Sequence, residues 1–268
     1  MIDLKIRDYL DFVLYYTGEN VDLPALVNRF LRTPIEKQKG RNGIRIFSID
    51  DVRLVCRKYV HGGLLRAITG DFFLTGKRAI NELEILLYLQ GKGFPVVHPY
   101  GVLVHGKSLT KKLHLLTVYA ENTTDLVDVL RISSTRKRLK LIQKLAKLFW
   151  ALEMLSVYHP DLHLSNVLVT RNGGLLFLDF DKAHRKTVTK KDMENMFWRL
   201  NRFAEKCEMS GRLRISPRDK ELFLRTYTRL SGYDFRPLMA DKLERKRFTS
   251  RIGWFIESLL YGNVKQKG

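Results

Sequence analysis

The stretch that decides the fold is residues 158–181, which read Y-H-P-D-L-H-L-S-N-V-L-V-T-R-N-G-G-L-L-F-L-D-F-D. Two short apolar runs within it predict two buried strands. An Asn-Gly pair between these runs is typical of a tight hairpin. The hairpin carries Asp161 and Asn166 on the loop before its first strand and Asp179 at the end of its second. We therefore expect three oxygen-bearing side chains to meet at one edge of the hairpin.

These three side chains suit phosphoryl transfer. One carboxylate accepts the proton of an attacking hydroxyl, while an amide and a second carboxylate hold Mg²⁺ against the phosphates of ATP. The pattern H-P-D-x-x-x-x-N followed by D-F-D resembles the protein-kinase catalytic loop H-R-D-x-x-x-x-N and its D-F-G segment. The alternative, an ordinary hairpin with capping acids, explains the spacing less well. Asp161 is the predicted base, and Asn166 and Asp179 are the predicted metal ligands.

Composition limits the class of protein. A chain of 268 residues with 45% hydrophobic residues can bury one large core or two lobes. No apolar run approaches the ~18 residues that cross a bilayer, and the first residues lack the order of a signal peptide, so we expect a cytoplasmic protein. The two cysteines, Cys56 and Cys207, fit no metal spacing. We interpret them as buried thiols in a reducing compartment.

The charge balance indicates an anionic partner. There are 48 Lys and Arg against 28 Asp and Glu, which gives a formal net charge of +20. Nucleic acid, an anionic membrane surface or a phosphorylated substrate would each be attracted. The basic residues do not alternate with aromatic residues in the manner of RNA-binding segments, so we expect no nucleic acid.

The first third of the chain predicts helices and then strands. Leu4, Tyr9, Phe12, Val13 and Tyr16 recur at helical spacing, which predicts a helix within residues 1–18, and Pro24 begins a second, shorter one.

A glycine-bearing basic turn at residues 39–43 then precedes strand-like runs at residues 44–49 and 53–59. Gly40 and Gly43 would let its backbone lie over phosphates, although an ordinary turn is the simpler interpretation.

The end of the second strand offers a cation to the nucleotide. Arg57 and Lys58 are adjacent, so only one can face the site. A helix predicted over residues 77–91 carries Glu82, which would pair with that cation. Further strands are predicted over residues 94–120, and the backbone of Tyr119 and Glu121 would receive the adenine edge.

The rest of the chain predicts mainly helices. Residues 135–157 form a basic amphipathic pattern, and more helices follow at residues 219–230 and 240–261. The run at residues 182–191 holds five Lys or Arg. Because it follows Asp179 directly, we expect it to line the acceptor side of the site.

Several motifs together resemble the lipopolysaccharide core kinases, and most closely the 3-deoxy-D-manno-octulosonic acid (Kdo) kinases of the protein-kinase-like superfamily. The resemblance covers residues 39–206. It rests on K-G-R-N-G, R-K-Y-V-H-G-G-L-L-R, R-A-I-N-E-L, L-L-T-V-Y-A-E, Y-H-P-D-L-H-L-S-N-V-L-V, L-F-L-D-F-D-K and R-L-N-R-F-A-E-K.

The resemblance implies an α+β, bilobal, protein-kinase-like fold. The first lobe, residues 1–120, would hold a small antiparallel sheet with helices, and residues 121–268 would form a mainly α second lobe. It places Gly40 and Gly43 in the nucleotide loop, Arg57 (with Lys58 beside it) as the strand cation, and Glu82 as its partner. Asp161, Asn166 and Asp179 keep the roles given above.

The departures from protein kinases also inform the substrate. Pro160 replaces the catalytic-loop arginine, Asp181 replaces the glycine of D-F-G, and no A-P-E follows. A small-molecule or glycolipid acceptor is therefore favoured over a regulated peptide substrate.

The resemblance implies an ATP- and Mg²⁺-dependent kinase of a Kdo hydroxyl on an anionic lipid A precursor. It would work in the cytoplasm, in peripheral contact with the inner face of the inner membrane. A heptose kinase, an aminoglycoside- or choline-type phosphotransferase and an atypical protein kinase remain alternatives, as does an RNA-binding module on an inactive kinase scaffold.

Overall fold

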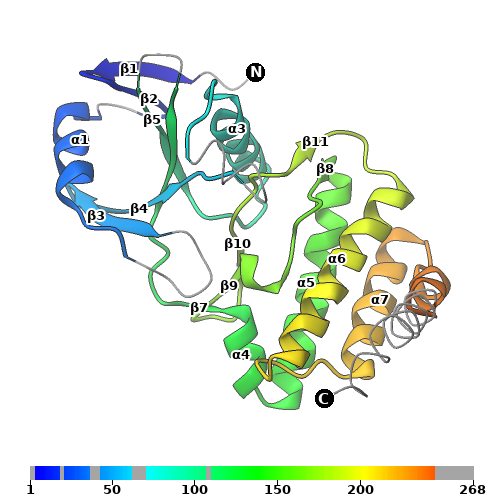
Figure 1. Cartoon of the computed structure of the whole chain (residues 1–268). Helices are drawn as coiled ribbons and strands as arrows, with labels where there is room; N and C mark the ends of the chain where they lie inside the picture. The colour runs from blue at the N-terminus through cyan, green and yellow to red at the C-terminus, as the bar shows by residue number, and fades with distance from the viewer. Residues whose placement is uncertain (1–3, 19–20, 37–42, 62–70, 107–109, 245–268) are drawn as a thin grey trace, which may run out of the picture.

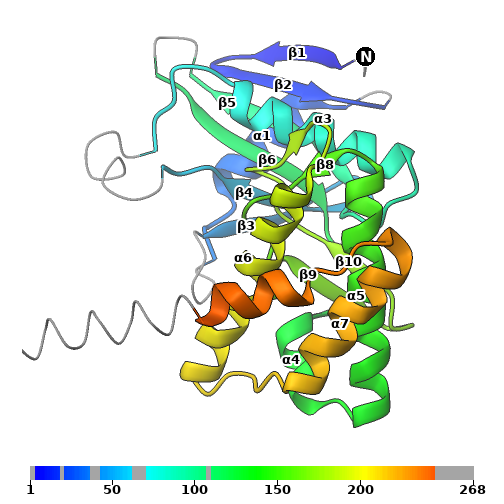
Figure 2. The same cartoon turned by 90° about the vertical axis from the view of Figure 1, so that its right-hand side faces the viewer.

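The computed structural model describes residues 4–18, 21–36, 43–61, 71–106 and 110–244. A six-stranded sheet and its helices form one part of the molecule, and a mostly helical part lies beside it (Figures 1 and 2). The elements of the first part are β1 (Lys5–Tyr9), β2 (Phe12–Tyr16), α1 (Leu23–Arg32), β3 (Ile44–Ile49), β4 (Val52–Lys58), α3 (Lys77–Gly91), β5 (Pro99–His105) and β6 (Lys112–Val118). The fold is α+β, as predicted.

The large sheet is antiparallel throughout, with the order β1-β2-β5-β6-β4-β3. Alternate side chains of each strand point to opposite sides of the sheet, and apolar side chains are buried on both sides. Val102 and Val104 of β5 belong to the apolar cluster around α3, whereas Leu103 belongs to a second cluster built on α1. The two helices therefore cover opposite faces of one sheet.

The first predicted helix is wrong. Residues 5–16 form the β1–β2 hairpin, whose turn holds Leu10 at φ 53°. Phe12, Leu14 and Tyr16 alternate with partly buried residues and are each less than 4% exposed. Burying one such side chain contributes roughly 1.5–3 kcal/mol, so packing against α1 outweighs the helical spacing that the same residues also show.

The second predicted helix is confirmed as α1. Its side-chain cap is Asp22, which accepts the backbone N–H of Ala25, and Pro24 lies in the first turn. The predicted strands over residues 44–49 and 53–59 and the helix over residues 77–91 are confirmed as β3, β4 and α3. The predicted turn at residues 39–42 lies outside the described residues.

The second part of the chain begins after β6. Its elements are β7 (Thr123–Asp125), α4 (Leu126–Ile132), α5 (Thr135–Met154), β8 (Val157–Tyr158), the 3₁₀ turn η1 (Leu164–Asn166), β9 (Val167–Thr170), β10 (Leu175–Phe177), β11 (His184–Arg185), α6 (Lys190–Met209) and α7 (Pro217–Ser231). β10, β9 and β7 form one small sheet, and β11 pairs with β8.

The helices of this part are close to their predicted positions. α5 ends at Met154, three residues early, because Ser156 turns back at φ 55° and the chain then enters β8. Residues 236–244 are helical, and the remainder of the helix predicted at 240–261 lies outside the described residues. No helix in the described ranges is long and apolar enough to cross a membrane.

The predicted hairpin is present and ties the two parts together. Residues 171–174 connect β9 to β10, and Gly173 adopts φ 71°, which glycine tolerates without strain. The segment after α3 runs beside β10, where the N–H of Val97 donates to the carbonyl of Phe177 at 3.0 Å. The carboxyl end of β10, which leads to Asp179, therefore lies next to the large sheet and α3.

Candidate active site

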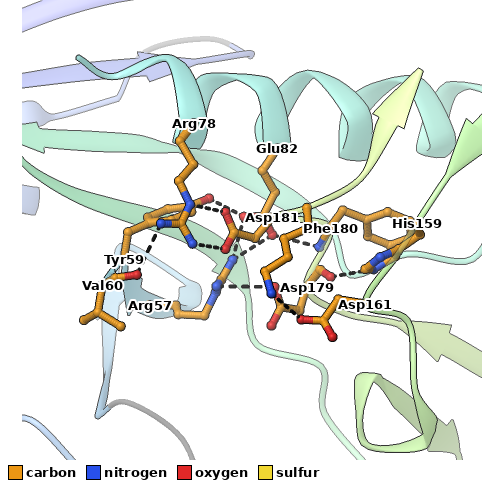
Figure 3. A network of polar contacts seen from close by, with 11 residues as sticks. Arg57, Tyr59, Val60, Arg78, Glu82, His159, Asp161, Asp179, Phe180 and Asp181 are labelled. Carbon is orange, nitrogen blue, oxygen red and sulfur yellow. Dashed lines mark hydrogen bonds and ion pairs between the residues drawn. The ribbon is translucent and has the colours of Figure 1, made fainter. Parts of the chain in front are cut away.

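The predicted base and metal ligands gather at one edge of the hairpin. The N–H of Leu178 donates to the carbonyl of Asn166 at 2.8 Å, so the chain just before Asp179 pairs with η1. His159 fixes the other side, because its Nε2 lies 2.8 Å from the carbonyl oxygen of Asp179. Asp161 follows His159 by two residues and lies beside Asp179 in Figure 3. The structure thus brings the three predicted residues to the same edge of the hairpin.

Glu82 is the centre of a buried network. Its side chain is 0% exposed and accepts two hydrogen bonds from Nη2 of Arg57, at 2.7 and 2.6 Å. It also accepts the hydroxyl of Tyr59 and, at 2.9 Å, the backbone N–H of Phe180. A buried carboxylate is tolerated only with such partners. Glu82 therefore holds both the strand cation and the D-F-D segment.

Of the two candidate cations, Arg57 faces this network. It pairs with Glu82 and lies 3.4 Å from a carboxylate oxygen of Asp179 (Figure 3). Lys58 pairs instead with Asp71. The alternation of β4 explains the difference, because residues 57 and 59 share one face and residue 58 points to the other.

A second ion pair anchors the same segment. Arg78, four residues before Glu82 on α3, forms two hydrogen bonds with Asp181, one of them at 2.6 Å. Residues four apart lie on one face of a helix. One face of α3 thus holds the D-F-D segment at two points. Glu82 binds the backbone N–H of Phe180, and Arg78 binds the carboxylate of Asp181. Asp181, which replaces the glycine of D-F-G, therefore anchors this segment to α3.

Asp161 makes a different set of contacts. Nε of Arg199 on α6 donates to its Oδ1 at 2.6 Å, and Nζ of Lys182 donates to its Oδ2 at 2.8 Å. Lys182 is exposed, at 59%, whereas Asp161 and Arg199 are partly exposed, at 34% and 32%. The predicted base therefore lies in an open cluster with two cations.

The pKa values of these groups follow their surroundings. Burial acts to raise the pKa of Asp161, but the hydrogen bonds from Lys182 and Arg199 outweigh it and lower that pKa. Burial raises the pKa of Glu82 to about 7, against the opposing effect of Arg57. Burial lowers the pKa of His159 to about 4, so its ring is neutral and donates to Asp179. Asp161 is thus ionised at neutral pH, as a proton acceptor must be.

The donor set fits a hard cation that shares its ligands with a nucleotide. Asn166 is buried and Asp179 is partly exposed, at φ 60°, so they offer an amide and a carboxylate oxygen. Among the described residues, no group of three or more His, Cys, Asp or Glu side chains could hold a metal. Mg²⁺ commonly takes one or two protein ligands and completes its shell with phosphates and water.

The remaining predicted nucleotide contacts are less well supported. Gly40 lies outside the described residues. Gly43 precedes β3, and a Cβ there would lie 2.0 Å from a methyl of Ile35, so packing accounts for this glycine. The N–H of Tyr119 donates to the carbonyl of Arg53 at 2.8 Å, so this donor is already used within the protein. Glu121 pairs with Arg53 at 3.2 Å.

The basic run at residues 182–191 is less free than its composition indicates. Besides Lys182, Lys186 pairs with Asp192, and Lys191 pairs with Glu194. The other two basic side chains lie over the rings of tyrosines: Arg185 over Tyr88 and Lys190 over Tyr233.

Sequence reasoning missed the roles of Tyr59, Arg78, Lys182 and Arg199. The spacing of Arg78 and Glu82 was a usable signal, because two ionisable residues four apart share a helix face. No local pattern connects Asp161 with Arg199, which is 38 residues away in the chain.

Comparisons with known proteins agree with this geometry. Residues 29–227 match the family described as the lipopolysaccharide kinase (Kdo/WaaP) family. A 3-deoxy-D-manno-octulosonic acid kinase of Mannheimia succiniciproducens is 29% identical over 196 residues, which span 69% of this chain and 80% of the relative. A 3-deoxy-D-manno-octulosonic acid kinase of Vibrio vulnificus is 24% identical over 192 residues, which span 70% of this chain and 80% of the relative. The kinase of the same name from Vibrio cholerae is 27% identical over 149 residues, which span 54% of this chain and 63% of the relative.

Proposed function

Because the chain belongs to the lipopolysaccharide kinase (Kdo/WaaP) family, we propose that it transfers the γ-phosphate of ATP to a hydroxyl of a Kdo sugar on a lipid A precursor. The family makes the chain a kinase with a hydroxyl acceptor, and the names of the relatives suggest the acceptor. The observation that carries the proposal is the meeting of Asp161, Asn166 and Asp179 at one hairpin edge.

In this proposal Asp161 accepts the proton of the attacking hydroxyl. Its carboxylate is ionised at neutral pH and is partly exposed, so a substrate hydroxyl can reach it. A positioned base of this kind typically contributes a factor of about 10²–10⁴ to turnover. His159 and the backbone around it orient the loop that carries Asp161.

Asn166 and Asp179 would hold Mg²⁺, which supplies charge neutralisation at the phosphate oxygens when bound. Arg57 would contribute the cation that contacts the phosphates, since it already lies between Glu82 and Asp179. Glu82 keeps Arg57 and the D-F-D backbone in place. The carbonyl of Tyr119 and the backbone of Glu121 would contact the adenine, and Gly40 and Gly43 would lie near the phosphates.

We further propose that the nucleotide lies between two lobes, residues 1–120 and 121–268. The large sheet comes from the first segment, and the catalytic hairpin and most helices come from the second. The net charge of +20 supports a cytoplasmic enzyme in peripheral contact with the anionic inner face of the inner membrane, where its glycolipid acceptor is embedded.

The test is a transfer assay with purified protein, ATP, Mg²⁺ and a Kdo-containing lipid A precursor, read by mass spectrometry. We expect the precursor to gain the mass of one phosphoryl group. A matched precursor without Kdo should gain nothing. If phosphate instead appears on a heptose acceptor, or on no glycolipid, the acceptor assignment is wrong.

A further inference from the structure

Two cations contact Asp161 directly. Its Oδ2 pairs with Lys182 and its Oδ1 with Arg199, so this cluster carries a surplus positive charge at the position of the base.

Stability does not explain the cluster. Lys182 is 59% exposed, and an exposed ion pair contributes only about 0–1 kcal/mol. Arg199 and Asp161 are partly buried, at 32% and 34% exposed, so water still screens their pair. Their effect on the base is also unfavourable for proton transfer, because both cations lower the proton affinity of Asp161. Two open cations beside a base are better explained by a substrate group that they bind.

The donors that remain define the chemistry of that group. Arg199 uses only Nε on Asp161, and no side chain or backbone group of the described residues accepts from its Nη1 or Nη2. Lys182 likewise donates only to Asp161. A guanidinium edge matches the two oxygens of a carboxylate, and an ammonium adds a point charge. The complementary ligand is therefore an oxyanion that lies near the reacting hydroxyl.

We infer that Lys182 and Arg199 bind the carboxylate of the acceptor sugar and so position its hydroxyl at Asp161. This inference rests on the proposed function, because the acceptor named for the relatives is a sugar acid. Binding of the carboxylate would also share the two cations between two anions, which restores basicity to Asp161. The transferred phosphate of ATP is the other oxyanion near the site, and the experiment separates the two.

The experiment compares two acceptors, the methyl glycoside of 3-deoxy-D-manno-octulosonic acid and the methyl ester of the same compound. Both are assayed with wild type, Lys182→Gln, Arg199→Gln and the double variant. Matched controls are Lys191→Gln from the same basic run and Arg202→Gln, an exposed arginine one turn along α6. KM for each acceptor, KM for ATP and acceptor binding without ATP are measured.

We expect wild type and both controls to prefer the acid over the ester by roughly 10- to 100-fold in acceptor affinity, the usual worth of charged hydrogen bonds. The preference should shrink in each single variant and vanish in the double variant, while KM for ATP stays within about twofold.

Three outcomes would overturn the inference. The first is a preference for the acid that survives in the double variant. The second is a rise in KM for ATP with acceptor discrimination intact, which would assign the cations to the phosphate. The third is equal use of acid and ester by wild type, which leaves the proposed function standing. Failure of wild type to phosphorylate any octulosonic acid acceptor, including the lipid A precursor, would contradict both the proposed function and this inference.

Discussion

Two clusters of charge meet in this site, and they differ in almost every physical respect. The cluster on Glu82 is buried, and its carboxylate is surrounded by donors from β4 and from the D-F-D segment. The cluster on Asp161 is open, and its cations come from the chain after Asp181 and from α6. A buried, fully bonded carboxylate fixes geometry, whereas an open one remains available to substrate. We therefore assign positioning to the first cluster and chemistry to the second.

The largest expected effect on the fold comes from breaking the buried cluster. Glu82→Gln removes the buried one of the two carboxylates that Arg57 contacts, and breaking a buried pair typically costs about 3–5 kcal/mol. We expect a loss of this size in the free energy of unfolding, measured by denaturant titration, together with loss of activity. Glu84→Gln, on the exposed side of the same helix, is the control and should behave as wild type. An unchanged unfolding midpoint for Glu82→Gln would contradict the assignment.

The second effect separates the adjacent cations of β4. Arg57→Ala should lower kcat/KM for ATP by roughly 10²-fold, the usual effect of removing one electrostatic contact at a reacting group. Lys58→Ala removes only a partly exposed pair with Asp71 and should change the free energy of unfolding by less than about 1 kcal/mol. Steady-state kinetics of both variants provide the measurement. A rise in KM for ATP in Lys58→Ala alone would reverse the assignment.

A third, smaller effect concerns pH. Burial lowers the pKa of His114 to about 3 and the pKa values of His159 and His163 to about 4. The contribution of each histidine to the free energy of unfolding is therefore fully present above its usual pKa of about 6.5. It is lost as the pH falls through the pKa of that histidine in the folded state. The raised pKa of Glu82 acts in the opposite sense, since its contribution is present below about 4.5 and is lost as pH rises through about 7.

Because the effect of three histidines opposes that of Glu82 alone, we expect the free energy of unfolding to rise by on the order of 1 kcal/mol between about pH 5 and 6.5. The measurement is urea unfolding at several pH values. His163→Gln should flatten the rise, whereas His184→Gln, at an exposed position, should leave it unchanged. A stability that falls over this range would show that Glu82 dominates.

The smallest effect is expected at the basic run that follows the site. Replacing Arg185, Lys186, Lys190 and Lys191 with Gln should reduce sedimentation with anionic vesicles by only a few-fold, because acids or tyrosine rings already contact all four. Lys182 is left intact because it contacts Asp161. Activity on a water-soluble Kdo acceptor should be retained. Equal sedimentation with neutral vesicles, or binding that does not weaken at high salt, would reject an electrostatic membrane contact.

The sequence allowed the proximity of Asp161, Asn166 and Asp179 to be predicted, because they lie within one stretch of 24 residues around a hairpin. Short-range spacing determines such a unit. The β1–β2 hairpin was mistaken for a helix because its apolar residues satisfy both periods, and only contact with α1 decides between them. The alternating, aromatic-rich run Phe12–Tyr16 was the signal for a strand.

The partners of the predicted residues were harder to find. Arg199 reaches Asp161 across 38 positions, and Arg78 reaches Asp181 across 103. Neither pair shares a local element, so its proximity depends on how α3 and α6 pack around the hairpin. The positive charge after Asp181 predicted an anionic partner, whereas in the structure Lys182 of this run contacts Asp161, the predicted base.

The most direct test of the division between the two clusters is Asp161→Asn, with turnover and unfolding measured on the same preparation. We predict that turnover falls by roughly 10²–10⁴ while ATP binding is retained. The free energy of unfolding should change by about 1 kcal/mol, because one ion pair of Asp161 is exposed and the other is only partly buried. Turnover near that of wild type, with chemistry rate-limiting, would contradict the account, as would a loss of stability comparable to that expected for Glu82→Gln.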